Sequence, residues 1–265
     1  MDILVRTVAL LEEKVDPRAK GYFLINSPLQ IFGTVVVYLV FSVWIGPALM
    51  QSRKPFNLHR VLQAYNLLQI ILCTSFTTTA IPVVRNAAIT FVCDPITSNT
   101  DYWTQMVIKY HWYYFLLKLL DLLDTVFFVL RKKNNQISFL HLYHHAGMFV
   151  ISWAFTAFFP SGQSALTGML NCFVHIWMYG YYFIASLGPN YAKYLKYKIH
   201  ITQLQMAQFL ILFLQALMPF TRDCGFPKPV ALLMMVQAMI FIYLFGKFYI
   251  NTFNFITITI HIFKR

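Results

Sequence analysis

Long apolar runs follow one another along almost the whole chain, and short polar segments separate them. A helix needs roughly 20 apolar residues to cross the hydrocarbon core of a bilayer, and each run approaches that length. We therefore expect an all-α integral membrane protein with about seven transmembrane helices in a single domain, residues 1–265. The predicted spans cover residues 29–50, 60–84, 109–130, 139–159, 165–187, 201–219 and 229–252.

The composition supports a membrane protein. Hydrophobic residues make up 58% of the chain and charged residues only 11%, whereas soluble domains carry about 25% charged residues. The net charge of +12 would suggest nucleic acid in a soluble protein. Here most basic residues fall between apolar runs, where membrane orientation and anionic ligands explain them better. We expect the lipid bilayer as a partner and no nucleic acid.

Basic residues concentrate in alternate loops, and the positive-inside rule places these loops in the cytosol. With seven spans the N-terminus is then lumenal and the C-terminus cytosolic. The first stretch, up to Lys20, is typical of a short amphipathic segment rather than a cleavable signal peptide. Some of the basic residues are also candidates for ligand binding. They are Arg53, Lys54, Arg60, Arg131, Lys132, Lys133, Lys193, Lys196, Lys198, Lys264 and Arg265.

Two of the four cysteines fall in loops on the other side. Cys93 and Cys224 follow the second and sixth predicted spans. In an oxidising lumen they are candidates for a disulfide, and the alternative is two free thiols at helix ends. Cys73 lies inside a span, where packing is its expected role.

Ionisable side chains inside spans are costly and by default mark functional sites. In the third predicted span, Lys118, Asp121 and Thr125 lie on one stripe of a helix, and Asp124 is adjacent. Pairing of Lys118 with Asp121 would lower the cost of burial. A structural ion pair that fixes helix packing is the alternative to a site role.

The fourth predicted span opens with three histidines. His141, His144 and His145 are spaced i, i+3 and i+4 and therefore share one helix face. Such clustering in an apolar segment favours a functional role over core packing.

The next two spans carry further polar stripes. Asn171, His175 and Tyr182 follow helical spacing in the fifth span, and Thr202, Gln205 and Gln208 recur every third residue in the sixth. Interhelical hydrogen bonding is the alternative for the sixth span. We expect these stripes to converge on one enclosed polar site beneath a cationic mouth.

Two chemistries suit buried histidines. Membrane desaturases and hydroxylases bind metal through several histidine boxes, whereas this chain has one, and His59, His111, His200 and His261 fall in loops or at helix ends. A single zinc site remains an alternative. The second chemistry is acyl transfer, in which a neutral imidazole attacks a thioester. Asn171, Gln205 and Lys118 are candidate donors to the oxyanion, and Cys172 is a weaker candidate nucleophile because it points away from His175.

Five stretches resemble the elongases of very-long-chain fatty acids, the condensing enzymes of the endoplasmic reticulum. Asp121 departs from the family pattern, which has Glu there, and this puts the reach of the carboxylate in doubt. The stretches, in family order, are GPALMQSRKPF (46–56), KLLDLLDT (118–125), QISFLHLYHH (136–145), NCFVHIWMYGYY (171–182) and TQLQMAQ (202–208).

The resemblance implies a barrel of six of the roughly seven helices around a closed-end acyl tunnel. It also implies a reaction without metal or other cofactor, in which long-chain acyl-CoA and malonyl-CoA give 3-oxoacyl-CoA, CoA and carbon dioxide. His144 would be the nucleophile and His175 its partner. His141, His145, Asn171 and Asp124 would complete the catalytic set. The residues implied to contact acyl-CoA are Lys118, Arg131, Lys133, Gln136, Lys198, Thr202, Gln205 and Tyr182.

The resemblance also implies location in the endoplasmic reticulum membrane and a lumenal disulfide between Cys93 and Cys224. Expected partners are the ketoreductase, dehydratase and enoyl reductase of the elongation cycle, with a homodimer as an option. Family members usually end in a lysine-rich retrieval tail, and this sequence ends in Phe263, Lys264 and Arg265.

The rival functions are a metal-dependent membrane lipid desaturase or hydroxylase and a non-enzymatic seven-helix transporter or receptor. The sequence does not fix the acyl chain length.

Overall fold

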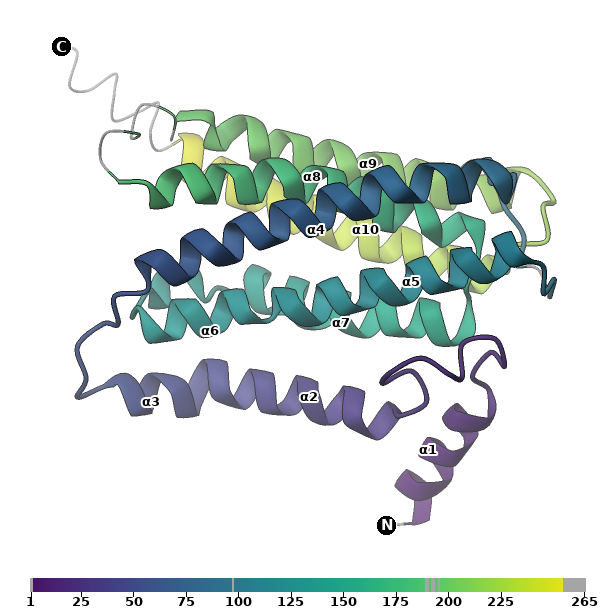
Figure 1. The fold of residues 1–265 in the computed structure, drawn as a ribbon, viewed down its shortest axis with the longest axis horizontal. Coiled ribbons are helices and arrows are strands. Elements are labelled where there is room, and N and C mark those ends of the chain that lie inside the picture. The colour runs from purple at the N-terminus through teal and green to yellow at the C-terminus, as the bar shows by residue number, and fades with distance from the viewer. Residues whose placement is uncertain (1, 97, 189–190, 192–193, 195, 255–265) are drawn as a thin grey trace. The chain divides into compact units, whose positions relative to one another are not determined.

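Helices dominate the chain in a computed structural model that describes residues 2–96, 98–188, 191, 194 and 196–254 (Figure 1). No strand is present among these residues, which agrees with the predicted all-α class. Lys193, His261, Lys264, Arg265 and the C-terminal tail lie outside the described residues. The helices are α1 Asp2–Glu13, α2 Pro28–Val40, η1 Phe41–Ile45, α3 Gly46–Met50, α4 His59–Asn86, α5 Tyr102–Asp121, α6 Leu123–Leu130, η2 Asn134–Gln136, α7 Phe139–Phe158, α8 Gly162–Ser186, α9 Lys198–Thr221, α10 Lys228–Tyr249 and η4 Ile250–Asn254.

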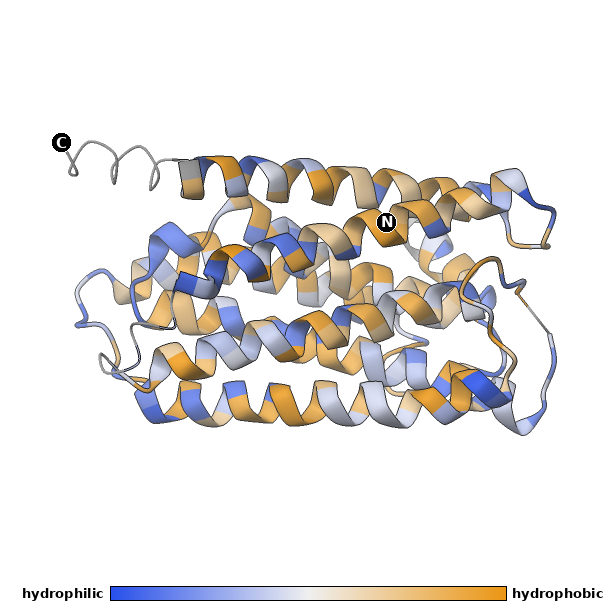
Figure 2. Cartoon of the chain, turned by 90° about the horizontal axis from the view of Figure 1, so that it is seen from above, coloured by the Kyte–Doolittle hydropathy of each residue, from blue (hydrophilic) through white to orange (hydrophobic). Residues whose placement is uncertain are grey.

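Within the described part of the chain, four helical segments are long and apolar enough to cross a membrane, and this confirms the integral membrane class. They are Pro28–Met50, His59–Asn86, Lys198–Thr221 and Lys228–Phe253. Figure 2 shows hydrophobic residues along much of the helices and hydrophilic ones gathered largely at their ends and in loops. Helices α5, α7 and α8 have 20 or more residues but carry the histidines and charges. The count of seven spans therefore stays a prediction.

The chain forms two compact units. Unit 1 consists of Met1–Leu58, Thr79–Ile89 and Ile96–Gly168, and unit 2 of His59–Thr78, Thr90–Pro95 and Met169–Arg265. In unit 1, α7 packs against both α5 and α2, and α3 packs against α6. In unit 2, α9 lies along α10. The prediction of one domain stays a prediction.

The core of unit 1 combines aliphatic and aromatic side chains and includes the segment between α1 and α2. Phe115 of α5 stacks on Phe149 of α7 with ring centroids 5.3 Å apart. Trp153 donates its indole N–H to the carbonyl of Ile25, which is fully buried. These contacts hold the segment before α2 on the α5–α7 pair.

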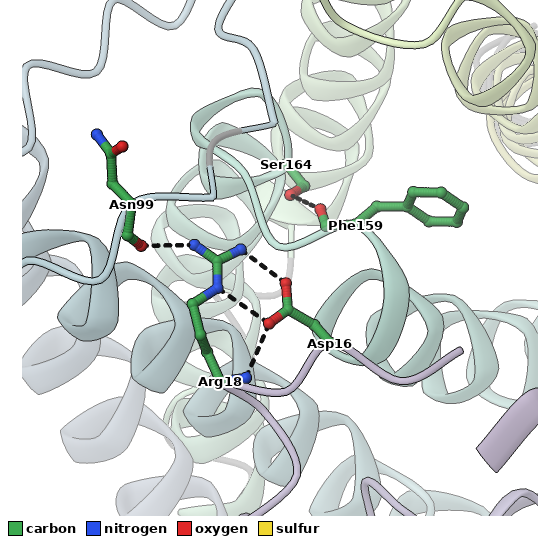
Figure 3. A network of polar contacts seen from close by, with 5 residues as sticks. All are labelled: Asp16, Arg18, Asn99, Phe159 and Ser164. Atoms are coloured by element: carbon green, nitrogen blue, oxygen red, sulfur yellow. Dashed lines mark hydrogen bonds and ion pairs between the residues drawn. The ribbon is translucent and has the colours of Figure 1, made fainter. Parts of the chain in front are cut away.

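The backbone of Asp16 fastens the same segment to the end of α7, and Arg18, paired with Asp16, fastens it to the loop before α5. Figure 3 shows the pair and the contact with Asn99. The Asp16 amide donates to the carbonyl of Ala157 at 2.7 Å. Arg18 forms an ion pair with Asp16 at 2.6 Å and donates to the carbonyl of Asn99. Burial alone would raise the pKa of the Asp16 carboxyl, but the hydrogen bonds and charge of Arg18 outweigh it and lower that pKa. The pair therefore stays ionised at neutral pH.

The predicted disulfide is present in unit 2. Cys93 and Cys224 are bonded, with their Cα atoms 5.9 Å apart. Asp94 orders the preceding loop, because its carboxylate accepts the backbone N–H groups of Thr90 and Phe91. Cys73 is a buried free thiol, as expected for a packing role.

The first long helix changes its winding between α2 and α3. In the π-helical turn η1 the Gly46 amide bonds to the Phe41 carbonyl. Tyr38, Ser42, Gly46 and Met50 are all buried, at four-residue intervals. A regular α-helix would turn such a series by about 40° at each step, and the wider π turn compensates part of that rotation. One continuous face therefore packs against α6.

Gly46 is where this face comes closest to α6. A Cβ atom there would lie 2.6 Å from Cγ1 of Val129 and 2.7 Å from the Phe41 carbonyl oxygen. Real Cβ atoms do not approach other atoms so closely. Only glycine fits this contact.

Replacing Gly46 by alanine is therefore expected to lower the free energy of unfolding by about 1–3 kcal/mol, the usual cost of overpacking. Gly33→Ala is the matched control, because a Cβ at Gly33 of α2 meets nothing within 4 Å. Thermal unfolding can be followed with a thiol-reactive dye, since Cys73 and Cys172 are buried. Equal melting temperatures for the two variants would contradict the close approach of α3 to α6.

Candidate functional site

The histidine face of α7 is formed by His141, His144 and His145 in unit 1. Ser138 caps the helix by accepting the amide N–H of His141. The ring centroids of His141 and His145 are 4.1 Å apart, and those of His144 and His145 are 5.5 Å apart. All three side chains are half-buried. The predicted grouping on one face is therefore present.

Two hydroxyl groups connect the histidine face to neighbouring helices. The Thr125 hydroxyl on α6 lies 2.8 Å from Nε2 of His141 and 2.7 Å from the hydroxyl of Tyr38 on α2. Thr125 is fully buried and Tyr38 is 6% exposed. Phe128 of α6 packs on the His141 ring with centroids 5.0 Å apart. His141 is thus held on one edge and one face.

Lys118 and Asp121 form a buried ion pair in α5. Lys118 Nζ lies 2.6 Å from the Asp121 carboxylate, and the two side chains are 3% and 5% exposed. The ammonium group also lies 5.0 Å from the ring centre of Tyr114. The shorter aspartate therefore reaches the lysine one turn away. Asp124 on α6 is half-buried.

The basic segment of unit 1 lies next to the start of α7 in sequence. Arg131 follows α6 and is half-buried, whereas Lys133 and Gln136 are exposed. Lys132 donates to the carbonyl of Gln51. Positive charge is therefore present one short loop before the histidine face.

The second cluster of predicted site residues lies wholly within unit 2 and contains one histidine, His175. His175 and Asn171 of α8 are 4% and 3% exposed. The His175 ring meets that of fully buried Tyr179 edge to face, with centroids 5.6 Å apart. Gln69 of α4 donates its amide to the hydroxyls of Tyr65 and Tyr179, at 3.0 and 3.3 Å. This network fixes the face of α8 that carries His175.

The predicted residues of α9 also lie in unit 2. Thr202 is buried and donates to the carbonyl of Lys198, while Gln205 donates to the sulfur of Met178. Lys198 is exposed, with its ammonium 5.3 Å from the ring centre of Phe248. Tyr182 is 42% exposed. The roles given to these residues, and to those of unit 1, stay predictions.

One histidine was placed wrongly by the sequence. The predicted helix began at residue 109, so His111 was expected at a helix end. Helix α5 instead begins at Tyr102, because the Asp101 side chain caps it by accepting two amide N–H groups. His111 is consequently buried, 2.9 Å from the carbonyl oxygen of Ser161 and 3.2 Å from the Ser164 hydroxyl. It ties the α7–α8 turn to α5.

Three further polar residues of the two clusters were not predicted. Tyr65 and Gln69 lie in the second span, where Gln63, Asn66 and Gln69 recur every third residue. That stripe is the signal that could have found Gln69, whereas Tyr65 lies off it. Tyr38 lies within the run VVVYLV, which reads as lipid-facing and carries no such signal.

The grouping of His, Cys, Asp and Glu side chains bears on whether the protein could bind a metal ion. Within the described part of the chain, no three His, Cys, Asp or Glu side chains are grouped so that they could hold a metal ion. A ligand set can assemble as a metal binds, so the expected reaction without metal or cofactor stays a prediction.

Comparison with known proteins confirms the resemblance seen in the motifs. The model of the ELO: GNS1/SUR4 family matches residues 23–256. The chain is 36% identical to very long chain fatty acid elongase 4 of Homo sapiens over 239 residues, which cover 90% of this chain and 76% of the relative. It is 38% identical to elongase 2 of Mus musculus over 239 residues, covering 90% and 81%. Against elongase 7 of Drosophila melanogaster it is 36% identical over 242 residues, covering 91% and 73%. The match spans α2 to α10 and both clusters of predicted site residues, and the chain belongs to the ELO family.

Proposed function

We propose that the protein is an enzyme of fatty-acid elongation that condenses long-chain acyl-CoA with malonyl-CoA in the endoplasmic reticulum membrane. The products are 3-oxoacyl-CoA, CoA and carbon dioxide. The observation that carries the proposal is the three-histidine face of α7, with His141 fixed by Thr125 and His144 close to His145. Its relatives, named very long chain fatty acid elongases, support the choice of substrate class.

In the first half-reaction, a ring nitrogen of His144 attacks the thioester carbon of acyl-CoA. The carbon–sulfur bond breaks, an acyl-imidazole forms, and the proton lost by the imidazole is taken up by the CoA thiolate. His145, with its ring centroid 5.5 Å away, is the group placed to relay that proton. An acyl-imidazole is itself an activated acyl donor, so the second step needs no further activation.

In the second half-reaction, malonyl-CoA loses carbon dioxide and its enolate carbon attacks the acyl group. The bond between the acyl carbon and His144 breaks, which releases 3-oxoacyl-CoA, and the departing imidazole takes up a proton from solvent to regenerate neutral His144. The enolate and the tetrahedral intermediate need donors that stabilise negative oxygen. The family resemblance implies His175 and Asn171, two of the polar side chains that α8 buries, for this role.

The remaining residues are assigned to the CoA moiety and the thioester. Phosphates require cations, which Arg131, Lys133 and Lys198 supply. Lys118, Gln136, Thr202, Gln205 and Tyr182 are assigned to the thioester region, and Asp124 to the catalytic set. Ketoreductase, dehydratase and enoyl reductase enzymes would consume the product.

The disulfide supports the proposed orientation of the chain in the membrane, with a lumenal N-terminus. Disulfides form in oxidising compartments, so the loops that hold Cys93 and Cys224 are assigned to the lumen. The N-terminus is then lumenal, and the basic loops and the start of α7 are cytosolic, where CoA substrates are available.

The test uses the purified protein in detergent. On mixing with a long-chain acyl-CoA alone, we expect a burst of about one CoA per active site, the signature of an acyl-enzyme. Malonyl-CoA should then yield 3-oxoacyl-CoA and carbon dioxide. CoA release that requires malonyl-CoA would contradict the covalent intermediate. Stoichiometric iron together with a desaturated or hydroxylated product would support the rival oxygenase, and binding without any release a transporter or receptor.

A further inference from the structure

We infer that Tyr38 and Thr125 are positioning residues, which hold His141 in the tautomer protonated on Nδ1 and thereby orient the histidine face of α7. The inference rests on the proposed function for its effect on rate. The chain of contacts joins three helices of unit 1, namely α2, α6 and α7. Its two links measure 2.7 Å from Tyr38 to Thr125 and 2.8 Å from Thr125 to His141 Nε2.

The direction of the hydrogen bonds follows from the protons available. Each hydroxyl carries one proton and accepts others, and the neutral imidazole has one donor nitrogen and one acceptor. A phenol is a stronger donor than an aliphatic alcohol, so Tyr38 donates to Thr125. Thr125 then donates to Nε2 of His141, which must be the acceptor nitrogen. The opposite order would leave the phenol proton of Tyr38, which is 6% exposed, without a place in the chain.

This assignment divides the work among the histidines. Nε2 of His141 is engaged by Thr125, so that nitrogen is not available to attack a thioester. The ring of His141 instead packs on His145 at 4.1 Å, and His145 lies next to His144. Fixing His141 therefore limits the positions open to His145 and, through it, the orientation of His144.

The packing of α2 supports a specific role for Tyr38. The π-helical turn keeps Tyr38 and Gly46 on one buried face, and Gly46 brings this face into close contact with α6. Thr125 lies one turn before Val129, the residue that Gly46 contacts. The first long helix therefore acts on the site through one hydroxyl, besides its packing role.

Four substitutions test the inference. Thr125→Val removes the donor at nearly constant shape, whereas Thr125→Ser retains it, and Tyr38→Phe removes only the phenol oxygen. Tyr243→Phe on α10, where the tyrosine is 66% exposed, and Thr34→Val on α2, where the half-buried threonine donates only to the Gln30 carbonyl of its own helix, are the matched controls.

We expect Thr125→Val to lower kcat about 10–100-fold, by analogy with the partners that orient histidine ligands of metals. KM for acyl-CoA should change less than about twofold. Thr125 is fully buried, so its replacement should not remove a contact that binds the substrate equally in the ground state and in the transition state. Thr125→Ser should restore most of the rate. Tyr38→Phe should have a smaller effect than Thr125→Val, since Thr125 can still donate to His141.

The second readout does not depend on activity. In protein labelled with ¹⁵N-histidine, the His141 signals, assigned with a His141→Gln variant, report which ring nitrogen carries the proton. Wild type and Thr125→Ser should show the Nδ1–H tautomer, and Thr125→Val a mixture. An unchanged tautomer and kcat in Thr125→Val would overturn the inference. If the wild type makes no 3-oxoacyl-CoA, the proposed function fails, while the tautomer still decides the role of Thr125.

Discussion

The His144→Ala variant is expected to lose 3-oxoacyl-CoA formation by about 10³-fold or more while it remains folded. If the imidazole of His144 forms the covalent bond to the acyl group, no neighbouring side chain can replace it without a change in geometry, and loss of a nucleophile typically has effects of at least this size. The initial burst of CoA should vanish together with turnover. Mass spectrometry of wild type mixed with acyl-CoA should find the acyl group on the peptide that contains His144.

His59→Ala is the matched control for this variant. His59 is exposed and begins α4, so its replacement should leave the burst and the turnover unchanged. Full activity of His144→Ala would end the assignment of the nucleophile. Loss of turnover with an intact CoA burst would place the acyl group on another residue, and His145→Ala would then be the next variant to examine.

The second large effect is expected at the buried ion pair. Lys118→Met should lower the free energy of unfolding by about 3–5 kcal/mol, because it leaves the Asp121 carboxylate buried without its cation. The double variant Lys118→Met with Asp121→Leu should recover most of this loss, since apolar side chains of similar volume replace buried ion pairs at little cost. Thermal unfolding in detergent measures both, and a single variant as stable as wild type would contradict the burial of the pair.

The double variant also separates the two interpretations of Lys118. A stable double variant that still condenses acyl-CoA with malonyl-CoA would show that the pair only fixes helix packing. A stable double variant with an intact fold and no turnover would show that the pair is needed for the reaction beyond its contribution to stability. Asp121→Glu, which restores the family residue, should keep the ion pair and serves as the control for side-chain reach.

The helices could be predicted to within a few residues where apolar runs have polar boundaries. The range 139–159 corresponds to α7, which starts at Phe139 because Ser138 caps it, and 60–84 corresponds to α4. The start of α5 was placed seven residues too late, at 109 rather than Tyr102. Its first turns contain Trp, Thr, Gln and Lys, so hydropathy alone does not reveal them, and only the Asp101 cap marks the true start.

The candidate site could be predicted where helical spacing alone groups the residues. His141, His144 and His145 share a face because a turn has 3.6 residues, whatever packs around them. The partners of these residues depend on which helices pack together. Nothing in the local sequence indicates that Tyr38 meets Thr125, 87 positions later, or that Gln69 lies between two tyrosine hydroxyls. Such contacts require the tertiary structure.

The bond between Cys93 and Cys224 has a consequence for how the molecule is made. The two cysteines are 131 residues apart in sequence, so their bond closes a large covalent ring. This ring contains α5 to α9 and therefore every histidine of both clusters. In the proposed orientation the ring cannot close before Cys224 reaches the oxidising lumen, by which time these five helices have all been translated. A chain cut by protease anywhere inside the ring would still migrate as one molecule until a reductant separates its fragments.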